Sequence, residues 1–267
     1  MKKIILAGLI ALSSQFALAE TQSKIDPAFV QVEEMVKANN MTGAYQALEK
    51  LGKAGNAQAL YNLAYLTQTG QGSTKDEKKA LQLYQQSANK GYPVANYVLG
   101  KNYLAGSLGL KQDTAKAKQY LEKASAQGFS DATVDLAVLL FSENTAASDK
   151  LALQKLEPLI KKGNFQAMHA KALYDISTGF KNKDEVPIKQ GLASIQDLAK
   201  KGYIPALMAV GNMFTNGNIV PQNLPEAKKI FSALAQENVP QAQESLAVVE
   251  KMMAEQAKAP SKTAKKS

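Results

Sequence analysis

A glycine recurs at intervals of 35 to 39 residues along this sequence and divides it into similar segments. It stands at Gly55, Gly91, Gly128, Gly163 and Gly202, with Asn238 in the sixth place. Four residues after each of them lies an alanine, at Ala59, Ala95, Ala132, Ala167, Ala206 and Ala242. A period of this length is typical of folds that stack one supersecondary unit upon the next, which restricts the chain to repeat architectures.

Three further positions share this period. A small residue lies nine positions after each joining residue, at Ala64, Gly100, Ala137, Ala172, Gly211 and Ala247. Another lies eleven positions before, at Ala44, Ala80, Ala117, Ala152, Gly191 and Ala227. A large apolar residue lies seven before, at Leu48, Tyr84, Leu121, Leu156, Ile195 and Phe231. Small side chains let two helices approach closely, and a large neighbour fills the space beside them.

The joining glycines separate helices, because glycine readily takes the left-handed conformation that ends a helix. Pro93 and Pro205 fit the first turn of the following helix. Asp76, Asp113 and Asp149 precede the second helix of their segments and are expected to cap it. Each segment is therefore predicted to be a pair of antiparallel helices.

One such pair cannot bury its apolar face alone, so the pairs must stack. We predict an all-α fold, a right-handed α-solenoid with six helix pairs from about Pro27 to Asn238. A last helix from about Pro240 to Lys258 is expected to cover the open end. Residues 20–257 are predicted to form one repeat domain.

Two loops carry the pattern of a known family. Residues 69–76 (TGQGSTKD) and 105–113 (AGSLGLKQD) resemble the loop of Sel1-like repeats, a branch of the tetratricopeptide superfamily. The following helix has the matching positions Ala80, Leu83, Tyr84, Ser87, Ala88, Gly91 and Ala95. The loops at 141–149 and 215–223 lack the glycine pattern, and the loop at 178–186 is expected to be longer. The resemblance implies a fold that binds other proteins.

Residues 1–19 have the pattern of a secretory signal peptide. Lys2 and Lys3 precede a short apolar run, and Ala17-Leu18-Ala19 forms a cleavage signal, so cleavage is expected after Ala19. The apolar run is too short to span a membrane. The mature protein is expected in the periplasm, and not as a lipoprotein, because the chain has no cysteine to acylate.

The net charge of +9 is concentrated at the two ends of the chain. The expected signal peptide and the tail at 258–267 hold six lysines between them, which leaves +3 on the remaining residues. A folded basic face for nucleic acid is therefore not expected. The tail is predicted to be disordered, and either a solvated end or a contact with membrane or cell wall fits its composition.

The sequence offers little for catalysis. It has no cysteine and one histidine, His169, so neither a metal site nor a cofactor is expected, and we predict that the protein is not an enzyme. Ser87 and Lys90 match the S-x-x-K of penicillin-recognising enzymes, but no K-T-G or S-D-N follows. A penicillin-recognising hydrolase is therefore a remote alternative.

The resemblance implies that the first helix of each pair lines a concave surface. The residues expected there are Tyr61, Tyr65, Gln68, Tyr97, Lys101, Val134, Phe141, His169, Met208 and Asn212. Aromatic and apolar side chains of this kind suit a protein-binding groove. A tighter curvature would instead bury the same side chains as core, and the sequence leaves both interpretations open.

These observations predict a periplasmic scaffold or adaptor that binds a polypeptide partner through its concave face. Some exported Sel1-like proteins resemble immunity proteins in role. An immunity protein that neutralises a secreted toxin, such as a phospholipase effector, is therefore the alternative. The identity of the partner is not encoded in any recognisable motif.

Overall fold

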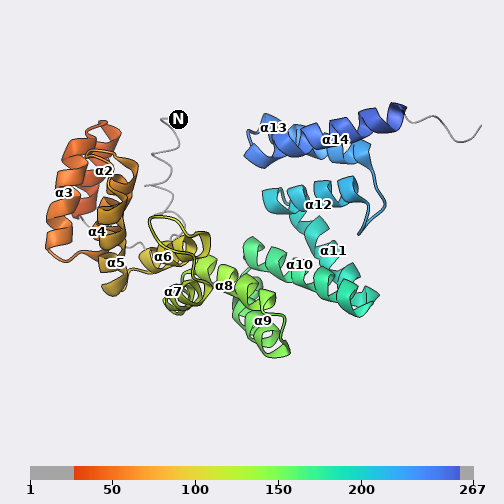
Figure 1. The fold of residues 1–267 in the computed structure, drawn as a ribbon, viewed down its shortest axis with the longest axis horizontal. Helices are drawn as coiled ribbons and strands as arrows, with labels where there is room; N and C mark the ends of the chain where they lie inside the picture. Colours follow the sequence, from red (N-terminus) through yellow and green to blue (C-terminus); the bar gives the residue numbers. More distant parts are fainter. Residues whose placement is uncertain (1–26, 259–267) are drawn as a thin grey trace, which may run out of the picture. The chain divides into compact units, whose positions relative to one another are not determined.

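The computed structural model describes residues 27–258. This part of the chain contains thirteen α-helices and no β-strand. The expected signal peptide at 1–19 and all but the first residue of the expected tail lie outside it. The chain divides into two compact units, one up to Leu139 and one from Leu140. Within each unit, consecutive helices fold back on one another (Figure 1).

The helices follow the order that the repeat predicts, six pairs and a final helix. The first unit contains α2 (Pro27–Lys37), α3 (Met41–Lys53), α4 (Ala57–Thr69), α5 (Glu77–Asn89), α6 (Pro93–Ala105), α7 (Thr114–Ala126) and most of α8 (Ser130–Ser142). The second contains α9 (Ala146–Lys161), α10 (Phe165–Asn182), α11 (Glu185–Lys200), α12 (Ile204–Asn216), α13 (Leu224–Gln236) and α14 (Pro240–Lys258). The prediction of an all-helical repeat fold is confirmed.

The joining residues end helices as predicted. All five glycines have positive φ angles between 76° and 95°, and Asn238 has a φ of 60°. These are left-handed conformations, which suit glycine and are tolerated by asparagine. The chain therefore turns at the same register position after every second helix.

The predicted N-caps are right for two of the three aspartates. Asp76 and Asp113 accept hydrogen bonds from the backbone N–H of Lys79 and Lys116, at 2.8 and 2.9 Å. Asp149 was expected to cap its helix and does not. That helix begins earlier, because Thr145 accepts from the N–H of Ser148 and caps it. Asp149 lies within the first turn instead.

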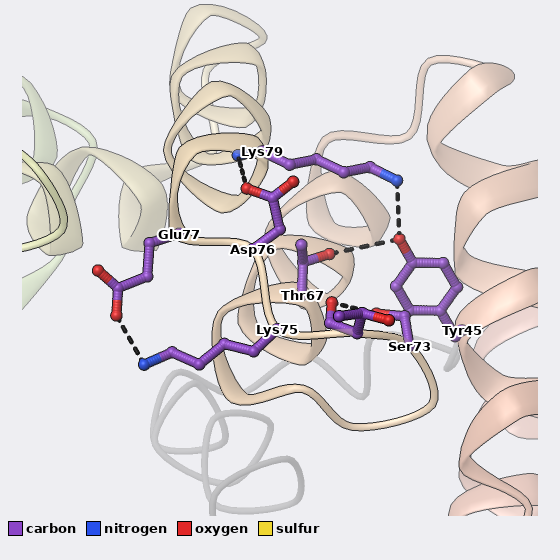
Figure 2. A pocket seen from close by; sticks show the side chains of 8 residues that line it. Tyr45, Thr67, Ser73, Lys75, Asp76, Glu77 and Lys79 are labelled. Carbon is purple, nitrogen blue, oxygen red and sulfur yellow. Dashed lines mark hydrogen bonds and ion pairs between the residues drawn. The ribbon is translucent and has the colours of Figure 1, made fainter.

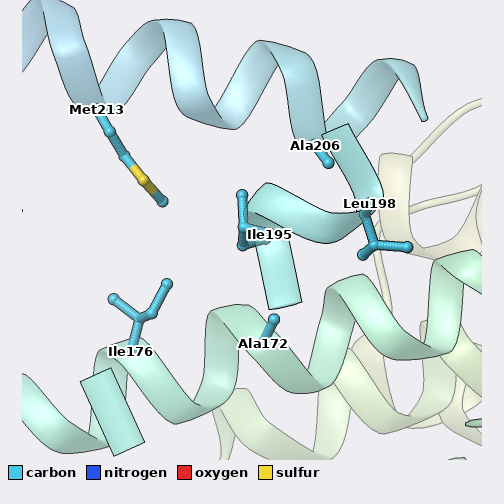
Figure 3. Packing of buried hydrophobic residues seen from close by; sticks show 6 residues of the cluster. All are labelled: Ala172, Ile176, Ile195, Leu198, Ala206 and Met213. Carbon is cyan, nitrogen blue, oxygen red and sulfur yellow. The ribbon is translucent and has the colours of Figure 1, made fainter. Parts of the chain in front are cut away.

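The small residues mark the places where paired helices approach most closely. A Cβ on Gly191 of α11 would lie 2.5 Å from the carbonyl oxygen of Ala172 on α10. A Cβ on Gly211 would lie 2.6 Å from the ring of Phe231. The large repeat residues are all buried, and Figure 3 shows Ile195 packed near Ala172 in the second unit. The predicted close contact of small and large positions is confirmed.

One repeat position departs from this pattern for a clear reason. Ala172 and the other small residues nine positions after a joining residue are buried, but Ala247 is exposed. Ala247 lies on α14, and the described chain has no further helix to complete its pair. The inner side of α14 buries Ala242 and Val249, while polar side chains such as Glu244 lie on its outer side. The helix thus covers the end of the stack.

The segment at 178–186 is not the long loop that the sequence suggested. Helix α10 continues to Asn182, and only Lys183 and Asp184 separate it from α11. Gly179 makes this possible, because a Cβ there would lie 2.6 Å from Cγ1 of Ile188 on α11. The first helix of this pair therefore has 18 residues, where α4, α6 and α12 have 13 each. None of the helices in the described range is long and apolar enough to cross a membrane.

The contrast between Ala172 and Ala247 tests the close approach of the helices. Replacing Ala172 with Val adds two methyl groups where no space exists and is expected to lower the free energy of unfolding by about 1–3 kcal/mol. Ala247→Val makes the same change at an exposed position and should cost less than about 1 kcal/mol, through helix propensity alone. Urea unfolding followed by circular dichroism measures both. Equal losses in the two variants would show that the repeat position does not control packing.

Candidate binding surfaces

Two of the predicted groove residues belong to the core of the first unit. Tyr61 is 6% exposed, and its ring lies 5.6 Å from that of Tyr84 and 5.4 Å from that of Tyr92. Burial raises the pKa of the Tyr61 hydroxyl well above its usual range. Val134 is 8% exposed. The prediction that Tyr61 and Val134 line a binding groove is wrong, because both side chains are buried in the core.

Tyr65 and Gln68 lie beyond Tyr61 on α4 and are half-buried. The side chain of Gln68 accepts a hydrogen bond from the Tyr84 hydroxyl at 2.9 Å. This bond ties α4 to α5 within one hairpin. Of these predicted residues on α4, Tyr65 has a partly accessible ring. Gln68 instead uses its side chain to hold α4 against α5.

Tyr97 and Lys101 meet on one carboxylate. The Tyr97 hydroxyl and the Lys101 ammonium both donate to Oδ2 of Asp135, at 3.1 and 2.7 Å. Burial raises the pKa of Tyr97, and the carboxylate of Asp135 raises it further. Asp135 lies one residue after Val134 and was not among the predicted groove residues. The three side chains connect α6 with α8, so this surface is fixed by polar contacts before any partner arrives.

The predicted residues of the second unit are distributed differently. Phe141 stacks on Tyr174 with ring centroids 4.1 Å apart. Met208 is half-buried against the cluster around Phe231, and Asn212 is exposed. His169 is half-buried with its ring 5.6 Å from that of Tyr203. Burial lowers the pKa of His169, and its Nε2 has no hydrogen-bond partner in the described structure.

Three exposed apolar side chains accompany His169. Phe165 is 37% exposed, Leu173 is 42% exposed and Ile204 is 41% exposed. Phe165 and Leu173 flank His169 at intervals of four residues on α10, so they share its side of the helix. Ile204 begins α12, next to Tyr203, whose ring lies 5.8 Å from that of Phe165. We call Phe165, His169, Leu173 and Ile204 the apolar face of the second unit.

The predicted groove positions missed Phe165 and Ile204, whereas Leu173 lies at a position that was expected to face the groove. Phe165 and Ile204 both stand two positions after a joining glycine, where the first unit has Ala57, Pro93 and Ser130. A large apolar residue at this position was the signal that could have identified them. Leu173 stands at the register position of Tyr65 and Lys101 and follows the rule that placed those residues in the groove.

A polar pocket of about 520 Å³ lies beside the loop at 70–76 (Figure 2). The Tyr45 hydroxyl from α3 lies 3.0 Å from Nζ of Lys79, which donates to it, and 3.5 Å from the hydroxyl of Thr67. Burial alone would raise the pKa of Tyr45, but hydrogen bonds from Lys79, Thr67 and Ser73 bring it below its usual value. These side chains satisfy one another's hydrogen-bonding groups. The hydrogen bond of Ser73 to Tyr45 links the loop to α3.

The structure gives no support to a nucleophilic serine. Ser87 is fully buried, and its hydroxyl donates to the carbonyl oxygen of Ala57 at 2.6 Å. It joins the two helices of one pair, α4 and α5, and is inaccessible to a substrate. Within residues 27–258, no group of three or more His, Asp or Glu side chains is placed to hold a metal ion.

Its stacked helix pairs define this chain as a helical-repeat protein. The family model of the Sel1 repeat matches residues 57–92, 93–129 and 204–239. The chain therefore contains three Sel1 repeats. Such repeats generally serve protein–protein interaction and are generally not enzymes. No protein of curated function matches the sequence significantly.

Three solved structures are similar. A Sel1 repeat protein from Oxalobacter formigenes has 21% identity and a TM-score of 0.64, over 82% of this chain and 86% of that one. The protective antigen c5321 from uropathogenic Escherichia coli has 25% identity and a TM-score of 0.58, over 78% of this chain and 44% of that one. Both support the fold. Immunity protein Pa5087 from Pseudomonas aeruginosa has 21% identity over 77% of this chain and 81% of that one. Its TM-score of 0.43 is too low to establish a shared fold.

The single histidine makes stability depend on pH in a defined direction. Because the folded pKa of His169 lies below the value of about 6.5 in an unfolded chain, the unfolded state binds the proton more readily. Stability is therefore expected to fall as the pH decreases from about 6.5 through the folded pKa. Thermal unfolding between about pH 7.5 and about pH 5 should show a decrease of a few degrees that His169→Gln removes. A variant with an unchanged slope would contradict this origin.

Proposed function

We propose that this protein binds a polypeptide partner through the apolar face of its second unit and acts as an interaction scaffold, not as an enzyme. The observation that carries the proposal is the accessibility of Phe165, Leu173 and Ile204 on neighbouring first helices. Isolated exposed apolar side chains are common, but several on one face indicate a binding surface. The general role of Sel1 repeats supports the same conclusion.

The energetics suit a moderate affinity. Covering the exposed part of one such side chain contributes on the order of 1 kcal/mol, so three of them provide a few kcal/mol. The central residues of protein interfaces contribute on this scale. The half-buried ring of Tyr203 packs against Phe165 and His169 and supports this face from below.

We further propose that the partner is met in the periplasm. The support is the amino-terminal pattern, in which Lys2 and Lys3 precede an apolar run and Ala17-Leu18-Ala19 precedes Glu20. The basic tail is then available outside the cytoplasm for contact with anionic surfaces.

The binding surface can be tested with two matched triple variants. Affinity purification of the mature protein from periplasm, followed by mass spectrometry, first identifies the partner. Phe165→Ser, Leu173→Ser and Ile204→Ser together are expected to weaken its binding roughly tenfold or more, measured by calorimetry with purified proteins.

The control replaces three exposed apolar residues of the same unit away from this face. Leu151→Ser, Val186→Ser and Val248→Ser remove a similar exposed apolar area and should leave the affinity within roughly twofold of the original. Circular dichroism establishes that both variants remain folded. Equal affinities of the two triple variants would rule out the apolar face as the binding surface.

Export can be tested independently of binding. The protein recovered from periplasm is expected to begin at Glu20, as measured by amino-terminal sequencing or intact mass. Ala19→Arg places a large charge at the cleavage position and should leave the signal peptide attached. An intact, full-length chain confined to the cytoplasm would disprove the periplasmic assignment.

A further inference from the structure

Long loops cover the second helix of the preceding pair in this fold. The loop at 70–76 lies over the start of α3, where a Cβ on Gly72 would overlap the carbonyl oxygen of Met41. Ser73, Thr74 and Lys75 of the loop line one pocket together with Tyr45 of α3 (Figure 2). Tyr45 stands ten residues before its joining glycine, Gly55.

The same arrangement recurs in the second unit with apolar contacts. Ile219 and Val220 of the loop at 217–223 pack against the core cluster that includes Ile195. Leu192 of α11 packs against the same cluster. Leu192 also stands ten residues before its joining glycine, Gly202. In both units, a loop of seven residues therefore covers this register position.

Helix α9 lacks such a cover. Its residue at the same register is Leu153, ten positions before Gly163. The connection that would cover it, between α10 and α11, consists only of Lys183 and Asp184, because α10 continues as a helix. A groove of about 790 Å³ is open instead. Its lining includes Ala146, Leu153, Ile160, Lys150, Lys171 and Tyr174.

The groove combines an apolar floor with a rim of both charges, because Asp149 and Glu157 line it beside Lys150, Lys161 and Lys171. Leu153 and Ile160 lie seven residues apart on one side of α9 and are half-buried. Lys161 pairs with Glu157 at 2.7 Å, and Lys171 pairs with Asp175 at 2.6 Å. Lys150, by contrast, has no ion pair within the described range. An occupant that carries a carboxylate beside its apolar residues would supply one.

We propose that this groove binds an extended segment of a partner polypeptide, in the place that the chain's own loop takes elsewhere. The segment places branched apolar side chains on Leu153 and Ile160, as Ile219 and Val220 lie on the cluster beside α11. A carboxylate in the segment contacts Lys150. This site goes beyond the apolar face proposed above, because Lys171 and Tyr174 lie on a different side of α10 from Phe165 and His169.

The chain's own loop supplies the probe. A fluorescein-labelled peptide of residues 215–224 (TNGNIVPQNL) carrying Asn223→Asp has the apolar pair and one carboxylate side chain. Its binding to the mature protein is measured by fluorescence anisotropy. We expect saturable binding in the range below about 1 mM, weakened roughly fivefold or more by Leu153→Gln.

Leu151→Gln is the matched control, because Leu151 is exposed on the same helix but does not line the groove. It should leave binding of the probe within roughly twofold of the original. Lys150→Glu, a change at an exposed side chain that leaves the core intact, should weaken binding of the Asn223→Asp peptide more than binding of the unmodified peptide. The triple variant of the apolar face should bind the probe normally, so the two proposals can fail separately.

Three results would overturn the proposal. The first is the absence of saturable binding up to about 1 mM. The second is an equal loss in the Leu153 and Leu151 variants, or equal effects of Lys150→Glu on the two peptides. The third is a roughly fivefold gain in affinity on removal of residues 259–267, which would make the protein's own tail the occupant of the groove.

Discussion

The structure depends on the close approach of the two helices in each hairpin. Gly191 leaves no space for a Cβ against the backbone of Ala172, and Gly211 leaves none against Phe231. Because these small residues let the two helix backbones come close together, side chains on both sides of the contact gain dispersion energy. One small residue can therefore set the separation of two helices. The same contact recurs in the first unit, where a Cβ on Gly100 would lie 3.1 Å from the side chain of Leu121. The exposed Ala247 shows that the residue type alone is insufficient without a paired helix.

Most of the fold could be predicted from local signals that repeat. A joining glycine with positive φ and a small buried residue each have one structural role, and five glycines and six buried alanines at fixed positions made these roles recognisable. The errors arose where two local signals competed. Asp149 is a good capping residue, but Thr145 caps α9 four residues earlier. The segment at 178–186 was predicted to be a long loop, yet Gly179 lets α10 continue as a helix against Ile188. A local cap decided the first case, and a contact between two helices, which a single sequence does not show, decided the second.

The binding surfaces were harder to predict, because exposure depends on neighbours that are remote in sequence. Tyr61 and Tyr65 both occupy positions expected in the groove. Tyr84 and Tyr92 cover Tyr61 alone, while Tyr65 stays half-buried. Asp135 was not predicted as a site residue. Its role becomes recognisable only once Tyr97 and Lys101 are seen to donate hydrogen bonds to its carboxylate. Register thus identifies the side of the helix, and the size of the neighbouring residues decides which side chains remain accessible.

The two units use the same repeat for different surfaces. In the first, Tyr97 and Lys101 direct their polar groups to Asp135, and the loop at 70–76 is fixed on α3 through Tyr45. In the second, the corresponding first helices expose apolar side chains, and one loop is reduced to two residues. The second unit lacks some of the intramolecular contacts that are present in the first. A partner can therefore cover the corresponding surface without first breaking a bond within the protein. Binding there would avoid the desolvation cost of separating paired polar groups, which supports the proposal that a polypeptide docks on the second unit.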